Sequence, residues 1–284
     1  MATIANKANN KPPETEHDLA TTKRILIGLA AGTMAGFSVA PFVATIDKSI
    51  VQNASGAATM RESIRGSVRE ILSRPHHFAR RYEFALIFGL YSATYQSSNV
   101  IDTFYDKYPD CSVSKDWGKF IGVSAVNMTL CIYKDRCFAR HFGMTKPRPV
   151  PMGSLTLWAM RDLMTIVSSF NVPHHGGRYL HENYDQWFSS EVKAFTFCQL
   201  VSPVLIQFFS TPLHLAGLDI YNNPSNTFKA RLRFIGREYV KSLIGRMCRI
   251  FPAFSLGGLG NKFYHDIIAD LTLHHPLEYI EIDD

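Results

Sequence analysis

The first long apolar run of the chain begins at residue 25. Residues 25–46 contain no charged side chain, and this length is close to that of a helix crossing a hydrocarbon core of ~30 Å. Gly28, Gly32 and Gly36 recur at every fourth residue, which places them on one face of a helix. A glycine face lets a neighbouring backbone approach closely, as occurs between helices in lipid. The pattern predicts a membrane-spanning helix that packs through its glycines and bends at Pro41.

Six charge-free windows follow one another along the chain. The first and fifth are long enough to span a membrane alone, and the second is borderline. The other three are short and polar, which is typical of helices that face lipid on one side and a polar interior on the other. A soluble protein with a kinked core helix is the alternative, disfavoured because a glycine-rich apolar run of this length is costly there. The windows are 25–46, 84–101, 120–133, 163–177, 194–218 and 250–261.

The segments between these windows alternate in charge. Three connections are basic: 47–83 has seven basic and four acidic residues (+3), 134–162 six and two (+4), and 219–249 seven and two (+5). The remaining segments are less basic: 1–24 (+1), 102–119 (−1), 178–193 (−1) and 262–284 (−5). The positive-inside bias predicts this alternation for six spans whose termini share one side.

Other classes of protein find less support in the sequence. The net charge of +6 would suit a nucleic-acid-binding protein, but no recognised nucleic-acid motif is present, so no nucleic-acid partner is expected. Dinucleotide, P-loop, zinc-protease and hydrolase motifs are also missing from the sequence. We therefore predict no enzyme and no catalytic, cofactor-binding or metal-binding residues. The polar, acid-containing segment 1–24 does not have the pattern of a cleaved presequence.

Long and short connections alternate, and this indicates an internal repeat. Pro41 and Pro212 each follow a charge-free stretch, and Asp47 and Asp219 come about two turns later, whereas the middle copy has no such proline. Amphipathic helices are predicted in two of the basic connections, at 60–73 and 228–244. The apolar face of the first comprises Ile64, Val68, Ile71 and Leu72.

Over roughly residues 19–273 this pattern resembles the mitochondrial carrier family. The resemblance rests on the glycine face, Pro41, Pro212, the Arg161-Asp162 pair and Arg249-x-x-Pro252. It implies an all-α membrane protein with six transmembrane helices in three pseudo-repeats and short amphipathic matrix helices. It also implies the mitochondrial inner membrane, with basic connections facing the matrix and both termini toward the intermembrane space. The implied segments are a polar tail 1–24, repeats 25–108, 115–188 and 190–273, and an acidic tail 274–284.

The charge pairs that close the gates of that family are missing at the matching positions. Where an acid and a base are expected after Pro41 and Pro212, the chain has Val43 with Ile46 and His214 with Gly217. At the other gate, Tyr105-Asp106, Tyr184-Asp185 and Phe263-Tyr264 have lost the basic member. An ion pair in a gate stabilises it only when both partners exist.

Two functions remain open. The favoured prediction is an accessory subunit of a large inner-membrane complex, in particular of the respiratory chain, with membrane lipids and other subunits as partners. The alternative is a divergent solute carrier that exchanges a small metabolite by alternating access. In that case Asp47 with Lys48, or Asp219, would supply the gate contacts, displaced by about one helical turn from the positions that the carrier family uses.

Candidate contact residues follow from both predictions. A solute cavity would be lined by Tyr91, Tyr95, Gln96, Arg161, Asp162, Arg246 and Arg249. Arg161 and Arg249 are read as helix starts, where snorkelling to the interface is the simpler explanation. No cofactor is expected apart from a structural lipid such as cardiolipin, with contacts at Phe234 and Gly236.

Overall fold

The computed structural model describes residues 14–143 and 148–273, and every regular element within these ranges is helical. This confirms the predicted all-α class. Residues 1–13 of the predicted polar tail and the whole predicted acidic tail 274–284 lie outside the described residues, whereas residues 14–24 of the polar tail belong to the first helix. The helices are α1 (Glu14–Ser55), α2 (Met60–Ser73), α3 (Pro75–Ala79), α4 (Tyr82–Lys107), α5 (Lys115–Phe142), α6 (Met152–Asn183), α7 (Glu191–Leu205), α8 (Gln207–Asn222), α9 (Phe228–Pro252), the π-helix η1 (Ala253–Leu259) and α10 (Gly260–Leu273).

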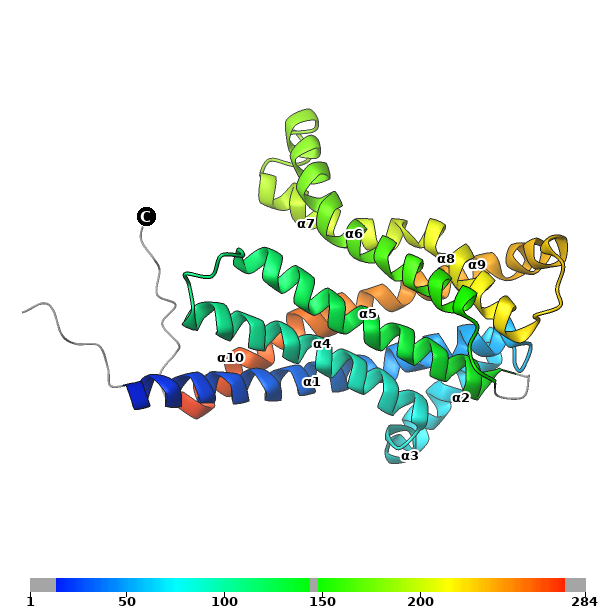
Figure 1. Ribbon diagram of the computed structural model, residues 1–284, viewed down its shortest axis with the longest axis horizontal. Coiled ribbons are helices and arrows are strands. Elements are labelled where there is room, and N and C mark those ends of the chain that lie inside the picture. Colours follow the sequence, from blue (N-terminus) through cyan, green and yellow to red (C-terminus); the bar gives the residue numbers. More distant parts are fainter. Residues whose placement is uncertain (1–13, 144–147, 274–284) are drawn as a thin grey trace, which may run out of the picture.

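Six long rods make up the body of the described chain (Figure 1). Four are the single helices α1, α4, α5 and α6; α7 continues into α8, and α9 continues through η1 into α10. Each rod packs on the next one along the chain, and the last one packs back on α1, so the rods form a ring in sequence order. Figure 1 also shows α6 and α7 leaning away from the other rods at one end of the bundle.

Two helical stretches are long and apolar enough to cross a membrane. They are Leu19–Ser55 and Glu191–Asn222, the same two windows that the sequence singled out as complete spans. The other four rods are less apolar, as their short windows indicated. Two span-length helices therefore support the general prediction of a helical membrane protein. They do not establish the finer prediction of six spans in a carrier arrangement.

The glycine face of α1 lies directly on α4. A Cβ atom at Gly28 would come within 2.9 Å of the Cβ of Asn99, and one at Gly32 within 2.7 Å of the backbone nitrogen of Gln96. The Asn99 amide donates a hydrogen bond to the carbonyl of Gly28 at 2.8 Å. Close backbone approach and interhelical hydrogen bonds are the interactions that hold helices together in lipid. At these two positions the structure places the α1 backbone against α4 without room for a side chain.

Large apolar side chains lie on the outside of the rods, while several charged side chains are buried. Phe37, Phe209 and Leu271 are more than half exposed, and only 28% of the apolar window in the α7–α8 rod is buried. Asp47 and Arg161, by contrast, are almost fully buried. An exposed apolar belt of this extent is unusual for a monomer in water and suits a bundle whose outer solvent is lipid.

Helix α2 matches the predicted amphipathic segment, but of its predicted apolar face only Ile71 packs against the core. Thr59 and Glu62 form a capping box at its start, and hydrogen bonds from Thr59 lower the pKa of Glu62. Ser63 packs inward and accepts a hydrogen bond from Ser49 of α1 at 3.0 Å. Exposed instead are Ile64, Val68 and Leu72. The second predicted amphipathic helix is not separate, since 228–244 is the first part of α9.

We expect Gly32→Ala to lower the free energy of unfolding by about 1–3 kcal/mol, because the added methyl group must push α1 away from the α4 backbone. Gly66→Ala in α2 is the matched control, since its added Cβ meets no atom within 4 Å. Thermal unfolding of the purified protein in detergent measures both. Equal midpoints for the two variants would contradict the close contact.

Candidate functional site: a buried polar layer

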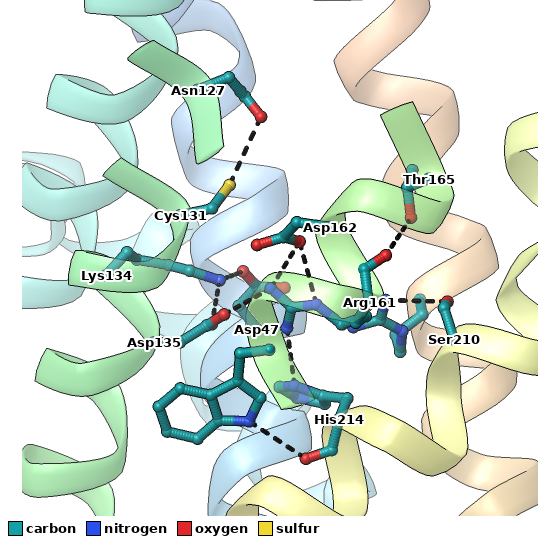
Figure 2. Close-up of polar contacts among 12 residues, drawn as sticks. Asp47, Asn127, Cys131, Lys134, Asp135, Arg161, Asp162, Thr165, Ser210 and His214 are labelled. Carbon is teal, nitrogen blue, oxygen red and sulfur yellow. Dashed lines mark hydrogen bonds and ion pairs between the residues drawn. The ribbon is translucent and has the colours of Figure 1, made fainter. Parts of the chain in front are cut away.

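Charged and polar side chains from five of the six rods meet inside the bundle (Figure 2). We call this set the polar layer. Each of these rods passes through this level, and each contributes the side chains that lie at that height. Its members are Asp47 of α1, Lys134 and Asp135 of α5, Arg161 and Asp162 of α6, Gln207, Ser210 and His214 of α8, and Arg246 and Arg249 of α9.

Asp47 joins three rods. Its Oδ2 accepts a hydrogen bond from Nζ of Lys134 at 2.6 Å, and Nη1 of Arg249 donates to both carboxylate oxygens at 2.8 and 2.9 Å. Asp47 is 5% exposed, so water does not screen these pairs. Removing one member of such a buried set leaves its partner charges uncompensated, which is strongly destabilising.

Arg161 extends the polar layer from α5 to α8. Its Nη2 donates to Oδ2 of Asp135 at 2.6 Å and to Oδ1 of Asp162 at 2.7 Å. Its Nη1 lies 2.7 Å from Nδ1 of His214, and the indole of Trp158 donates to the carbonyl of His214 at 3.3 Å. The Arg161 side chain is fully buried, so all of its compensation comes from these protein groups.

Two groups in the polar layer are incompletely compensated. Arg246 is 2% exposed and donates to Oε1 of Gln207 at 3.0 Å and Oγ of Ser210 at 3.3 Å, but no carboxylate of the described residues forms an ion pair with it. Oδ2 of Asp162 is buried and accepts no hydrogen bond from the described chain. Buried polar groups are normally paired, so these two require an explanation.

The formal charges of the polar layer do not cancel. Its cations are Lys134, Arg161, Arg246 and Arg249, and its anions are Asp47, Asp135 and Asp162, so four positive and three negative charges leave +1 with His214 neutral. Ionisable groups at this depth in a membrane bundle mark a solute or ion pathway by default.

Further ion pairs lie away from the polar layer, between the end of α4 and the start of α5. Lys119 approaches Asp102 at 2.5 Å, and Lys115 approaches Asp106 at 2.7 Å. Arg24 of α1 lies 4.0 Å from Asp106. These side chains are between 32% and 46% exposed, so each pair contributes little to stability.

Of the three residues suggested as displaced gate partners, Asp47 alone is a member of the polar layer. Lys48 pairs with Glu83 of α4 at 2.6 Å. Asp219 accepts a hydrogen bond from Nε of Arg231 at 2.8 Å, across the turn from α8 to α9.

The residues predicted for the cavity separate into two groups. Arg161, Asp162, Arg246 and Arg249 lie together in the polar layer, and Tyr91 is within electrostatic reach of Arg249. The other two make contacts elsewhere: the Tyr95 hydroxyl donates to the carbonyl of Ala253 at 2.8 Å, and the Gln96 amide donates to Leu29 and Thr33 of α1.

The helix starts proposed for two arginines are wrong. Helix α6 begins at Met152, nine residues before Arg161, and Arg249 lies near the end of α9. Both guanidinium groups point into the polar layer, where they bind carboxylates, rather than toward an interface.

Sequence reasoning missed Lys134, Asp135 and His214. The first two were counted as part of a connection because a charge-free window ends at Tyr133, yet α5 continues through Phe142. One signal was available: a lysine and an aspartate side by side at the end of an apolar window can compensate one another in the interior. His214 carried no signal of its own.

Other parts of the described chain offer less chemistry. Residues 14–143 and 148–273 contain no group of three or more His, Cys, Asp or Glu side chains able to hold a metal ion. Phe234 is partly buried, with the Arg237 guanidinium 5.8 Å from its ring centre, and a Cβ at Gly236 would meet no atom within 4 Å.

An apolar exterior, two span-length helices and an incompletely paired polar interior are features of a helical membrane protein with a polar interior. The chain belongs to the family described as "Probable citrulline exporter", whose model matches residues 31–267. No curated protein and no solved structure matches the chain. The family is one of transporters and not of enzymes.

This family corrects two predictions. The assignment to the mitochondrial carrier family is wrong, because the family model that matches is a different one. The accessory-subunit function is wrong as well, since the family is described by an export activity. The physical reason for the second error is visible in the polar layer: charges missing at the expected positions are supplied by Asp47, Lys134 and Asp135 at others.

We expect Asp47→Asn to lower the free energy of unfolding by about 3–5 kcal/mol, because Lys134 and Arg249 would lose a buried partner. Asp106→Asn is the control, since its pair with Lys115 is nearly half exposed and contributes at most about 1 kcal/mol. Thermal unfolding in detergent compares the two. A loss for Asp47→Asn no larger than that for Asp106→Asn would rule out an essential polar layer.

Proposed function

We propose that the protein is a membrane transporter that exports citrulline, and that the polar layer binds the amino-acid head group. The observation that supports this is the pair of uncompensated groups: the guanidinium of Arg246 and Oδ2 of Asp162. An α-amino acid at neutral pH presents a carboxylate and an ammonium group. These are the two partners that the polar layer lacks.

The chemistry of the two groups fits a zwitterion. Arginine binds carboxylates through two parallel hydrogen bonds, and Arg246 has donors left over after its contacts with Gln207 and Ser210. An ammonium group has three donors and would satisfy the free oxygen of Asp162. Asp162 and Arg246 both belong to the polar layer, and the proposal is that one small solute contacts both. A zwitterion adds no net charge to the interior.

Access to these groups requires the bundle to change shape. Arg246 and Oδ2 of Asp162 are shielded in the present arrangement, which is therefore closed at the polar layer. The contacts of Asp47 with α5 and α9 hold this closure. We assign them the role of a latch that parts in the alternate state, as alternating access demands. Tyr91 and Tyr95 form the α4 wall of the pathway in this proposal, and Gln96 is a packing residue.

The proposed topology has six spans, with the three basic connections on one side and both ends on the other. Four charged residues of the middle basic connection are buried and do not face the membrane surface. They are two cations, Lys134 and Arg161, and two anions, Asp135 and Asp162, so leaving them out keeps the net charge of 134–162 at +4. Only the carrier resemblance implied the mitochondrial inner membrane. The proposal therefore names no particular membrane and concerns only the orientation of the spans. Anionic lipid such as cardiolipin is expected beside Phe234, Gly236 and the basic connections.

Purified protein in liposomes loaded with radiolabelled citrulline should release it faster than protein-free liposomes. Arg246→Gln should reduce the rate at least about tenfold, because the solute carboxylate loses its partner. Arg233→Gln, an exposed arginine on the same helix, should leave the rate unchanged. Release of citrulline no faster than from protein-free liposomes would overturn the proposed function.

Labelling with a membrane-impermeant maleimide tests the topology. In a background whose other cysteines are serine, Cys111 in the α4–α5 connection and a Ser225→Cys residue in the α8–α9 connection should label from opposite sides of sealed vesicles. Permeabilising the vesicles should make both react. Labelling of both residues from one side would contradict the alternating spans.

A further inference from the structure

Five of the six charge-free windows lie on one side of the polar layer, and the remaining one, 194–218, runs through it. In α1 and α5 the window precedes the buried charges Asp47 and Lys134, and in α4, α6 and α9 it follows Glu83, Asp162 and Arg249. Since consecutive rods run in opposite directions, these segments occupy one band of the bundle. A solute whose head group is held by the polar layer therefore extends into a band without formal charges on the rods. A neutral terminal group suits this band better than an ammonium or guanidinium group.

Asn127 stands in this band directly above the polar layer (Figure 2). It shares one face of α5 with Cys131, Lys134 and Asp135, because these residues follow it by four, seven and eight positions. Its Oδ1 lies 3.7 Å from Sγ of Cys131, which is within electrostatic reach of Asp162. One helical turn, roughly 6 Å, separates Asn127 from Cys131 along the axis. The inference places the head group in the polar layer, about one helical turn below Asn127, and a propyl chain covers a distance of this order.

The hydrogen-bonding groups at Asn127 are complementary to a ureido group. Asn127 Nδ2 donates to Oγ1 of Thr94 on α4 at 3.2 Å, so an amide and a hydroxyl from two rods meet there. A carboxamide offers both donors and an acceptor, and a ureido group presents the same set in return. An ammonium or guanidinium group has donors only, so it would leave the second N–H of the Asn127 carboxamide, the one not donated to Thr94, without an acceptor.

We infer that Asn127 is the specificity-determining residue that recognises the ureido end of the solute, with Thr94 as its orienting partner. This inference rests on the proposed function, since it assumes that the head group lies at Arg246 and Asp162. It assigns the preference for citrulline over ornithine and arginine to a neutral hydrogen-bonding site, which the charge-free band surrounds.

Competition in proteoliposomes tests the inference, because a ratio of two rates does not depend on how much protein is active. Export of citrulline is measured against ornithine, which ends in an ammonium group, and against norvaline, which ends at the propyl chain. The wild-type protein should prefer citrulline over both. Asn127→Asp should lower the citrulline-to-ornithine ratio at least about tenfold, because its carboxylate binds an ammonium group. Asn127→Leu should lower the citrulline-to-norvaline ratio by a similar factor.

Two controls accompany these variants. Asn127→Gln keeps the carboxamide and should keep the preference for citrulline, whereas a role in packing alone would not distinguish glutamine from leucine in this way. Asn183→Asp makes the same chemical change at an exposed position and should leave both ratios unaltered. If Asn127→Asp does not fold, the citrulline-to-norvaline ratio of Asn127→Leu still tests the role of Asn127.

The outcomes separate the two proposals. If the wild-type protein does not move citrulline, the proposed function fails. If it moves citrulline and the Asn127 variants keep the wild-type ratios, the function stands and the role of Asn127 is overturned.

Discussion

The burial of charge inside a lipid-facing bundle is the constraint on which this structure depends. Asp47 cannot be buried alone, because an isolated carboxylate in such a medium is too costly, so it binds Lys134 of α5 and Arg249 of α9. Arg161 similarly requires Asp135 and Asp162. These requirements determine which rods must meet and at what height. Lipid contributes little to bringing apolar faces together, so the polar contacts and the glycine face of α1 supply the specificity of the packing.

The same constraint explains why the interior can act on a solute. A fully compensated set of buried charges would be inert, but Arg246 and Asp162 retain unused hydrogen-bonding capacity. The remaining pairs, by contrast, are strong enough to hold the rods closed. Stability and the proposed binding thus depend on one cluster, and Asp162 would take part in both through its two oxygens. In the proposed function, a zwitterionic solute would supply the missing partners without adding net charge, so it would alter the pairing of the charges at the position where the rods are joined.

Much of the fold followed from the sequence, because hydrophobic length and glycine spacing are local properties. The two span-length rods, the glycine contact of α1 with α4 and the helix at 60–73 are all visible as patterns. The membership of the polar layer was harder to see. Lys134 and Asp135 look like the start of a connection, and only the continuation of α5 to Phe142 places them inside. His214 and Gln207 join through tertiary contacts that no spacing encodes. The accessory-subunit prediction failed for this reason: it equated the loss of charges at expected positions with the loss of charge pairing.

The π-helical segment Ala253–Leu259 between α9 and α10 has a consequence for motion. Its wider turns hold more residues per turn than an α-helix, and π-helical turns occur mostly at functional positions. Tightening one such turn would rotate everything beyond it by roughly 100° and advance it by about 1.5 Å. Asn261, which exchanges two hydrogen bonds with Asn99 of α4 at 3.0 and 2.8 Å, begins the segment that would turn. Such a change would redirect the far half of the last rod and break the hydrogen bonds between Asn261 and Asn99, while Arg246 and Arg249 would keep their places.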